Sequence, residues 1–361
     1  MKTNKRRNWQ QTAFPTRGRS AGFSLIELMI ATAMFLIVAG AAFSLLASHQ
    51  PLFNQQQNKA ALNINVRNAI AQMQLDLVNA GTGYYVGANI PGWPVGVTIQ
   101  NSNPGTSCFN STTHVYSSTC FDHINVIAMD ANTPPVHPTD STGTTCVSTT
   151  SSTIFTDPAP GMTLAQTAAV FHDGDQLLLV KSDGSQMTTT ILSSDGDTSG
   201  GKVRLQHNPT AADGTNTSTD DPLGISTNLN NKLGTNFCGS DWVLKISPIL
   251  YSVDASDSSN PKLMRSQGGS SSVLAEQVIG FKVGATLWNA GTSTDTLAYN
   301  YDSSSYGYEY SRVRSVQISL IARTVPVTDP TYKFRNLFDQ GPYEIEGVSA
   351  VVNPRNMSMK D

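Results

Sequence analysis

The chain has 361 residues, a formal net charge of −3 at pH 7 and a charged fraction of only 14%. This length is enough for one large or two modest domains with a sizeable core. No basic patch of the kind that neutralises phosphates is visible, so the composition argues against nucleic-acid binding.

The first 22 residues form a basic leader that contains no Asp or Glu. Its charges come from Lys2, Lys5, Arg6, Arg7, Arg17 and Arg19. From Leu28 to Ala47 no residue is charged, and a helix of this length covers about 30 Å, the thickness of the hydrocarbon core of a bilayer. We expect this segment to span a membrane. Because positively charged flanks stay on the cytoplasmic side, the leader should face inward and the rest of the chain outward.

Glu27 is a single acid at the front of this apolar segment. An ionised carboxylate inside lipid costs a few kcal/mol or more, and such residues usually mark a function and have a partner. The sequence therefore predicts a specific partner for Glu27.

The residues from Gly22 to Glu27 resemble the cleavage and methylation signature of type IV prepilins. The signature consists of a basic leader, a Gly before the cut, a Phe or similar residue after it, and a Glu as the fifth residue of the mature chain. The resemblance implies that a prepilin peptidase cuts between Gly22 and Phe23 and methylates the new amino group of Phe23. It also implies that Glu27 is an assembly residue, which pairs with that amino group on a neighbouring subunit and so relieves the desolvation cost of both charges.

A long N-terminal helix is expected over residues 23–81, with a membrane part at 23–47 and an amphipathic part at 52–80. Pro51 should kink or interrupt it between the two parts, because proline lacks an amide donor and clashes with the preceding turn. The amphipathic part carries one apolar stripe at helical spacing, formed by Leu62, Val66, Ala69, Ile70, Met73 and Leu77. This stripe should pack on an outer domain, and Gly81 is the expected stop.

Residues 82–361 have the pattern of a β-rich extracytoplasmic domain. Short apolar or alternating runs predict strands at 175–180, 187–192, 202–206, 242–247, 279–285 and 316–322. Ser182-Asp183-Gly184 lies between the first two runs as a hairpin turn, and a turn at Asp195-Gly196-Asp197 precedes the third. We therefore predict an α+β, pilin-like fold, in which the long helix packs on a largely antiparallel β-sheet.

Three stretches rich in Ser, Thr, Gly, Asn and Pro are typical of surface loops. They cover residues 101–119, 134–153 and 208–235. They are candidates for partner contact, and solvated decoration without a specific role explains them equally well.

All four cysteines follow the membrane segment, on the side where an oxidising compartment permits disulfides. They are Cys108, Cys120, Cys146 and Cys238. Four cysteines allow three connectivities, and the sequence alone does not decide among them. The short Ser/Thr-rich loop favours Cys108 with Cys120, which leaves Cys146 with Cys238.

The sequence contains no Gly-x-Ser-x-Gly elbow and no His-Glu-x-x-His pair, and its six histidines accompany no evident nucleophile. We predict neither an enzymatic activity nor a cofactor. Asp195, Asp197 and Ser199 resemble the first half of a calcium loop, but Gln206 stands where the bidentate Glu is required. An ordinary turn is therefore favoured over a calcium site at Asp195 and Asp197.

Three further segments resemble the minor pilin and pseudopilin group called PilW/PulJ. They are Asn65 to Leu77, Leu263-Met264-Arg265 followed by Leu274 to Val278, and Arg312 to Arg323. The resemblance covers the helix and the distal third of the chain, and between residues 100 and 240 it is confined to the hairpin at Gly174-Asp175. It implies a minor type IV pilin that helps to initiate or tip a pilus.

This resemblance also implies partners and a location. The partners would be prepilin peptidase, the inner-membrane assembly platform, and other minor and major pilins. The protein would cross the bacterial inner membrane once and then enter a pilus or pseudopilus. A J-type pseudopilin of a type II secretion system is the alternative, although such pseudopilins tend to be smaller. A membrane-anchored adhesin or surface enzyme that uses the long loops on sugars or surfaces is a further alternative.

Overall fold

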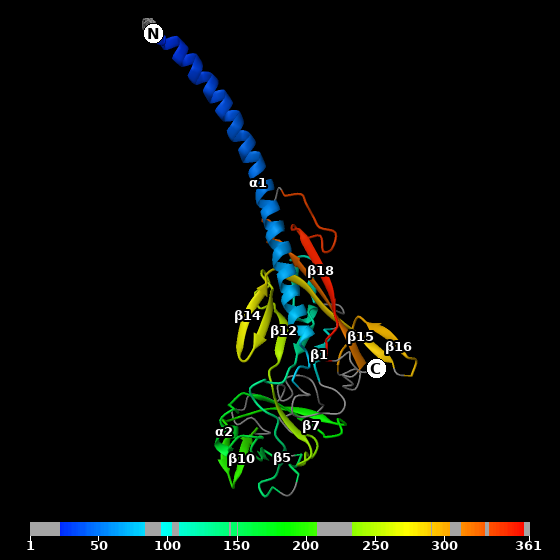
Figure 1. Cartoon of the computed structure of the whole chain (residues 1–361). Helices are drawn as coiled ribbons and strands as arrows, with labels where there is room; N and C mark the ends of the chain where they lie inside the picture. The colour runs from blue at the N-terminus through cyan, green and yellow to red at the C-terminus, as the bar shows by residue number, and fades with distance from the viewer. Residues whose placement is uncertain are drawn as a thin grey trace, which may run out of the picture. The chain divides into compact units, whose positions relative to one another are not determined.

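The computed structural model describes residues 22–83, 95–102, 108–143, 146–149, 151–207, 233–289, 291–303, 312–328 and 332–356. The chain divides into two compact units, an N-terminal unit (Met1–Gln57) and a β-rich unit (Asn58–Asp361). Helix α1 (Leu25–Val78) contributes to both units, whereas all described strands lie in the β-rich unit (Figure 1). The strand pairings are antiparallel throughout the described residues. The predicted α+β class is confirmed.

Helix α1 runs without a break through Pro51, so the predicted interruption is wrong. A proline removes only one hydrogen bond from the ladder, and the residues on both sides continue the helix. The predicted apolar stripe is buried, with Leu62, Val66, Ala69, Ile70, Met73 and Leu77 between 0% and 7% exposed. The helix ends at Val78, three residues before Gly81, whose φ is 73° and whose N–H donates to Ile127 O at 2.8 Å.

Two sheets share one core with the second half of α1, and together they form the main lobe (residues 58–126 and 249–356). The first sheet has the order β1 (Val97–Gln100), β4 (His123–Val126), β12 (Ile249–Asp254), β13 (Lys262–Gln267) and β14 (Ser270–Ala275). The second has the order β16 (Thr294–Ala298), β15 (Val278–Asn289), β17 (Val313–Arg323) and β18 (Ile345–Val352). Their inner faces and the helix stripe form one continuous hydrophobic cluster.

An inserted lobe (residues 127–248) leaves the main lobe after β4 and returns at β12, which pair with each other. One of its sheets has the order β11 (Trp242–Ile246), β7 (Gln176–Val180) and β8 (Met187–Ile191). The other has the order β5 (Pro138–Thr139), β6 (Thr153–Thr156), β10 (Lys202–Gln206) and β9 (Asp197–Ser199). A short helix α2 (Leu164–Ala168) packs in the larger of two hydrophobic clusters in this lobe. The smaller cluster also includes Val95 of the main lobe. Figure 1 shows the inserted lobe in green.

The six predicted strands are present as β7, β8, β10, β11, β15 and β17, and β7 and β8 form the predicted hairpin. The turn before β10 differs from the prediction. Asp197 already begins β9, and the chain reverses at Gly200 and Gly201, whose φ angles are 60° and 76°. Only glycine adopts such angles without strain, so the glycine pair and not the acidic triplet makes this turn.

Two of the three predicted loops carry local structure. The first contains β2 (Phe109–Asn110), β3 (Val115–Tyr116) and the beginning of a 3₁₀ turn at Ser118–Cys120. The second contains β5 and two isolated bridges, at which Val136 and Val147 are buried. Isolated Val side chains in a Ser/Thr-rich stretch give no strand period, which is why the pattern does not reveal them. Most of the third loop, 208–232, lies outside the described residues.

Candidate processing and assembly site

The junction between Gly22 and Phe23 is accessible. Residues 22–24 precede the helix and have no regular secondary structure, and Phe23 is 88% exposed. Apart from Gly22 and its immediate chain neighbours, no described residue has an atom within 4 Å of the position that a Cβ on Gly22 would take. The chain's own packing therefore does not require glycine here, and an enzyme that needs a small residue at the junction can reach it.

Glu27 caps the first turn of α1. Its Oε2 accepts a hydrogen bond from Ser24 N at 3.0 Å, and Ser24 Oγ accepts one from Ile26 N at 3.3 Å. This exchange is a variant of the capping box, which satisfies amide groups that a helix start leaves without partners. In the uncut chain the carboxylate thus lies beside the amide of the residue that follows Phe23.

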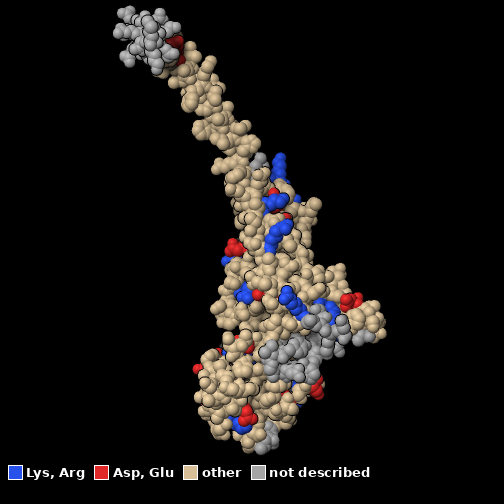
Figure 2. All heavy atoms as spheres, in the orientation of Figure 1, with Lys and Arg blue, Asp and Glu red and all other residues tan. Residues whose placement is uncertain are grey.

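The apolar part of α1 meets the length requirement for a membrane span. It covers Leu25–Ala47, 23 residues, and none of it is buried inside the protein. Thr32, a polar residue within it, donates its hydroxyl to Leu28 O at 2.8 Å. Figure 2 shows the surface of this segment without Lys or Arg, and with acid only at its start. A helix that is apolar all round and uncovered needs lipid or other helices around it.

The outer face of α1 within the β-rich unit is mostly apolar or small, with the exposed Arg67 at its edge. Ile64 and Leu75 lie eleven residues apart, hence on one face after three turns, and are 58% and 59% exposed. Ala60, Asn68 and Ala71 are exposed on the same face. Solvent-facing helix surfaces usually carry charged residues. This face is better suited to pack against another helix.

The inner side of the same stretch is joined to the first sheet by a polar lock, defined as Asp76, Tyr251 and Arg265. Asp76 Oδ2 accepts hydrogen bonds from Arg265 Nε at 2.8 Å and from the Tyr251 hydroxyl. Burial and the bond to Asp76 raise the pKa of Tyr251, and the same carboxylate raises the pKa of Arg265. The lock orients α1 on the sheet, and so fixes which face remains outside.

Two disulfides brace the β-rich unit, Cys108–Cys120 and Cys146–Cys238. The first closes the β2–β3 excursion. The second joins segments 92 residues apart in the inserted lobe. Loops of this length lose much conformational freedom when closed, which stabilises a fold by about 2–4 kcal/mol.

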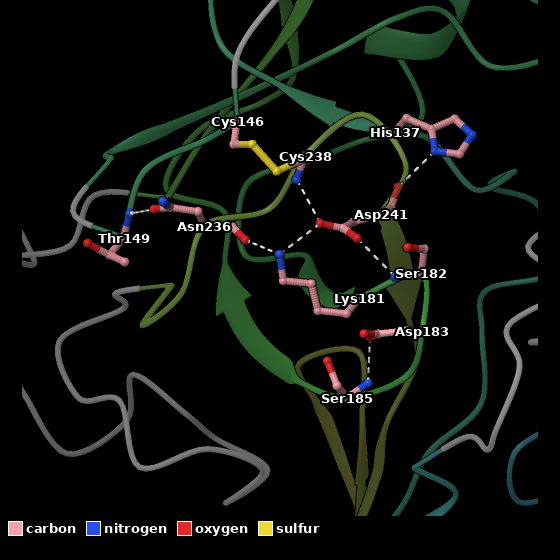
Figure 3. Close-up of polar contacts among 10 residues, drawn as sticks. All are labelled: His137, Cys146, Thr149, Lys181, Ser182, Asp183, Ser185, Asn236, Cys238 and Asp241. Atoms are coloured by element: carbon pink, nitrogen blue, oxygen red, sulfur yellow. Dashed lines mark hydrogen bonds and ion pairs between the residues drawn. A yellow bond between two sulfur atoms is a disulfide. The ribbon is translucent and has the colours of Figure 1, made fainter.

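Beside the second disulfide, Asp241 collects four polar contacts (Figure 3). Its carboxylate accepts from Cys238 N at 2.7 Å, Ser182 N at 2.9 Å and Lys181 Nζ at 3.1 Å, and its carbonyl oxygen lies 2.8 Å from His137 Nδ1. Burial opposes ionisation of Asp241, but these donors outweigh it and hold the pKa below its usual range.

The rest of Figure 3 extends this network without adding a reactive group. Lys181 Nζ also donates to Asn236 O, and the Asn236 side chain accepts from Thr149 N at 3.1 Å. The cluster is a structural staple between the hairpin β7–β8 and the segment before β11.

The two candidate calcium ligands have protein partners. Both carboxylate oxygens of Asp197 accept from Arg204, which lowers the pKa of Asp197. Asp195 Oδ1 accepts from Asp173 N at 2.9 Å and lies 3.8 Å from His172 Nδ1. Within the described ranges, no group of three or more His, Cys, Asp or Glu is placed to hold a metal.

Residues 17–43 match the model of the prokaryotic N-terminal methylation motif. No curated protein and no solved structure matches the chain. The matched range contains the Gly22–Phe23 junction, Glu27 and most of the apolar segment.

The motif together with the apolar helix supports a type IV pilin-like or pseudopilin-like precursor. It indicates a structural protein rather than an enzyme, and it fits a membrane-anchored pilin. It implies processing by prepilin peptidase and association with pilins.

Two residues that hold α1 in place were missed from the sequence alone, one at its start and one in the polar lock. Ser24 was not assigned a role, although Ser-x-x-Glu spacing before an apolar run is a capping signal. Asp76 was not assigned a role either, and nothing in the local pattern indicates its partners, which lie 175 and 189 residues further along the chain.

Proposed function

We propose that this protein is a minor type IV pilin of the PilW kind. Prepilin peptidase cuts it between Gly22 and Phe23 and methylates Phe23. The helix then leaves the inner membrane and enters a filament, and the β-rich unit is carried outward. Its role is to help initiate or tip the pilus, together with the assembly platform and other pilins.

The observation that carries this proposal is the accessible Gly22–Phe23 junction directly before an acid-capped apolar helix. A cut there creates a positive amino group four residues before Glu27. In lipid each of these charges is costly alone. Pairing the amino group of one subunit with Glu27 of the next satisfies both. The hydrogen bond that Glu27 accepts from Ser24 N keeps its carboxylate at the helix start until that partner arrives.

A second support is the mostly apolar outer face of α1, from Ala60 to Leu75, on which Arg67 at the edge is the charged residue. It extends the surface available for helix packing beyond the apolar segment. Helices that pack side by side need small or apolar residues at their contact. A protein that acted as a lone anchor would have no need for this face.

The size of the β-rich unit favours the pilus branch over a secretion pseudopilus, since J-type pseudopilins tend to be smaller. Gene deletion tests this choice. Loss of surface pili by electron microscopy with unchanged secretion would support the minor pilin. Normal piliation with a secretion defect would instead assign the protein to a type II secretion system.

The processing step is tested by mass spectrometry of the protein from wild-type cells. The mature chain should begin with N-methyl-Phe23. Gly22→Leu should retain the leader, whereas Met29→Leu, a conservative change beyond the junction, should be processed normally. An intact leader in wild-type cells would contradict the proposal.

A further inference from the structure

The connection between β17 and β18 presents large apolar side chains to solvent. We call the described residues of this connection, 324–328 and 332–344, the β17–β18 tip. Leu337 is 96% exposed, Phe338 is 60% exposed, and Phe334 is 44% exposed. Lys333 and Arg335, both exposed, alternate with them. Exposed apolar side chains gathered in one short segment mark an interaction site.

This segment is held in place from beneath. Asn336 and Asp339 are buried, and Asn336 Oδ1 accepts from the backbone N–H groups of Phe338 at 2.8 Å and Asp339 at 2.9 Å. Asp339 Oδ2 accepts from the hydroxyl of Tyr116 at 2.5 Å and from that of Tyr343. A buried, fully bonded polar network fixes a turn. The exposed side chains are therefore presented by a rigid base.

The tip lies at the end of the β-rich unit where α1 enters it. Lys59 Nζ is 3.1 Å from Glu344 Oε2, and Arg355 N donates to Val78 O at 3.3 Å. Strand β18 thus runs in the same direction as the second half of α1. Thr324, at the other end of the connection, donates its N–H to Glu344 O at 2.9 Å. Figure 1 shows the connection, in orange and red, beside this part of the helix, and Figure 2 shows Lys and Arg side chains there.

The chain itself limits how far this end is from the membrane. Only twelve residues separate Ala47, the end of the apolar segment, from Lys59. That is about 18 Å of helix. A bilayer surface is therefore within reach of the tip whenever Leu25–Ala47 is inserted.

The charges of the exposed tip residues indicate which kind of partner would bind there. The exposed stretch from Tyr332 to Phe338 has two basic residues and no acid. Of the acids in the rest of the described tip, Asp339 is buried and Glu344 is paired with Lys59. Aromatic and apolar side chains interleaved with Lys and Arg are the composition of membrane-interface contacts, in which the basic groups meet anionic headgroups.

We propose that the β17–β18 tip docks the β-rich unit on the surface of a bilayer that contains anionic lipid, with Leu337 and Phe338 inserted at the headgroup level. This inference rests on the membrane anchorage in the proposed function and not on the type of filament. Docking orients the unassembled subunit, and entry into a filament detaches the tip.

The test uses the full chain at one copy per lipid nanodisc. The four cysteines are all in disulfides, so an introduced cysteine takes a nitroxide label alone. Leu337→Cys reports the tip, Val351→Cys reports an exposed site at the other end of β18, and Ala41→Cys reports the span. In discs with anionic lipid, labels at 337 and 41 should be more accessible to oxygen than to a water-soluble nickel chelate, and the label at 351 should show the reverse.

A double variant tests how much the basic residues of the tip contribute to docking. Lys333→Ala with Arg335→Ala should shift the docking equilibrium toward the undocked state roughly 30-fold in anionic discs, and much less in zwitterionic discs. If the label at 337 is in water while the label at 41 is in lipid, the docking proposal is overturned and the membrane anchorage still stands. An aqueous signal at 41 would show that the anchorage itself fails. In discs with two copies, the label at 337 could instead show spin–spin broadening. If it does so while single-copy discs show no lipid contact, the tip is a contact between subunits and the lipid proposal is overturned.

Discussion

The two halves of α1 belong to one helix and have opposite relations to the rest of the chain. Between Leu25 and Ala47 none of the helix is buried by this protein. Between Leu62 and Leu77 the inward-facing residues are almost completely buried against two sheets. The first half obtains its apolar surroundings from outside the molecule, and the second half obtains them from within.

This difference shows where the chain depends on partners. The second half is folded once the β-rich unit is folded, because the stripe and the polar lock supply its contacts. The first half is left with apolar surface on all sides and one acid. Its surroundings can therefore change, from lipid to neighbouring helices, without unfolding the part of the chain that carries the β-rich unit.

The largest expected effect comes from the acid of the uncovered half. Glu27→Leu should insert in the membrane but be at least about 100-fold depleted from filaments, since removing one partner of a desolvated ion pair costs about 3–5 kcal/mol. Quantitative immunoblotting of sheared filaments against membrane fractions measures this ratio.

A matched variant separates charge from capping. Glu27→Gln keeps an oxygen that can accept from Ser24 N but removes the charge, so it should be depleted nearly as strongly as Glu27→Leu. If Glu27→Gln assembles like the wild type, helix capping and not charge pairing is the role of this residue.

Two methionines test the contrast between the halves directly. Met73 is 0% exposed and Met34 is 64% exposed. Met73→Ala should destabilise the β-rich unit by about 2–5 kcal/mol, because it leaves a cavity in the core. Met34→Ala should leave the thermal unfolding of that unit unchanged. Equal shifts in unfolding temperature for both variants, measured on the full chain in detergent, would remove the distinction.

The polar lock should matter less than the core. Asp76→Ala leaves Arg265 without its carboxylate, at a site where the two side chains are 12% and 22% exposed. We expect a loss of about 2 kcal/mol, below the range for fully buried pairs because some solvent reaches both groups. The double variant Asp76→Ala/Arg265→Leu should cost less than the sum of the single changes. Additive losses would show that the pair does not act as a unit.

Local patterns predicted much of the fold. Ile279, Phe281, Val283 and Ala285 alternate with less apolar neighbours, and all four are buried on β15. The period of two identifies a strand and its buried face but not the strand it pairs with. The pairing of β4 with β12 across the whole inserted lobe is set by contacts between distant segments, and no local signal carries that information.

The candidate site likewise has residues that a local sequence pattern reveals and residues that only contacts between distant segments reveal. Gly22, Phe23 and Glu27 were selected because the processing signature lies within a few neighbouring residues. The partners of Asp76 lie 175 and 189 residues further along the chain, so Asp76 does not stand out before the chain is folded. The unbroken passage of α1 through Pro51 was mispredicted because a local rule was applied to a helix with long stable stretches on both sides.

Acid should lower the stability of the packed half. Burial opposes ionisation of Asp339, but hydrogen bonds from Tyr116, Tyr343 and Asn336 outweigh it and hold its pKa below the usual value. Stabilisation from such a group is complete above the unfolded pKa of about 3.9 and is lost as the pH falls through the lower folded pKa. The unfolding temperature of the β-rich unit should therefore drop below about pH 4, and less steeply in Asp339→Asn. A parallel pH dependence in both proteins would contradict this assignment.

The smallest expected effect concerns the ion pair nearest the boundary between the two halves. Lys59 and Glu344 are 3.1 Å apart, but the Lys59 side chain is 58% exposed. Exposed pairs contribute about 0–1 kcal/mol, because water and salt screen them, so Lys59→Ala should barely change the unfolding temperature at high salt. Lys262→Ala, at a pair 4.0 Å apart with side chains 35% and 60% exposed, is a suitable control. If Lys59→Ala instead costs several times more than Lys262→Ala, the packing of α1 depends on its junction with the uncovered half, and the two halves are less independent than their burial indicates.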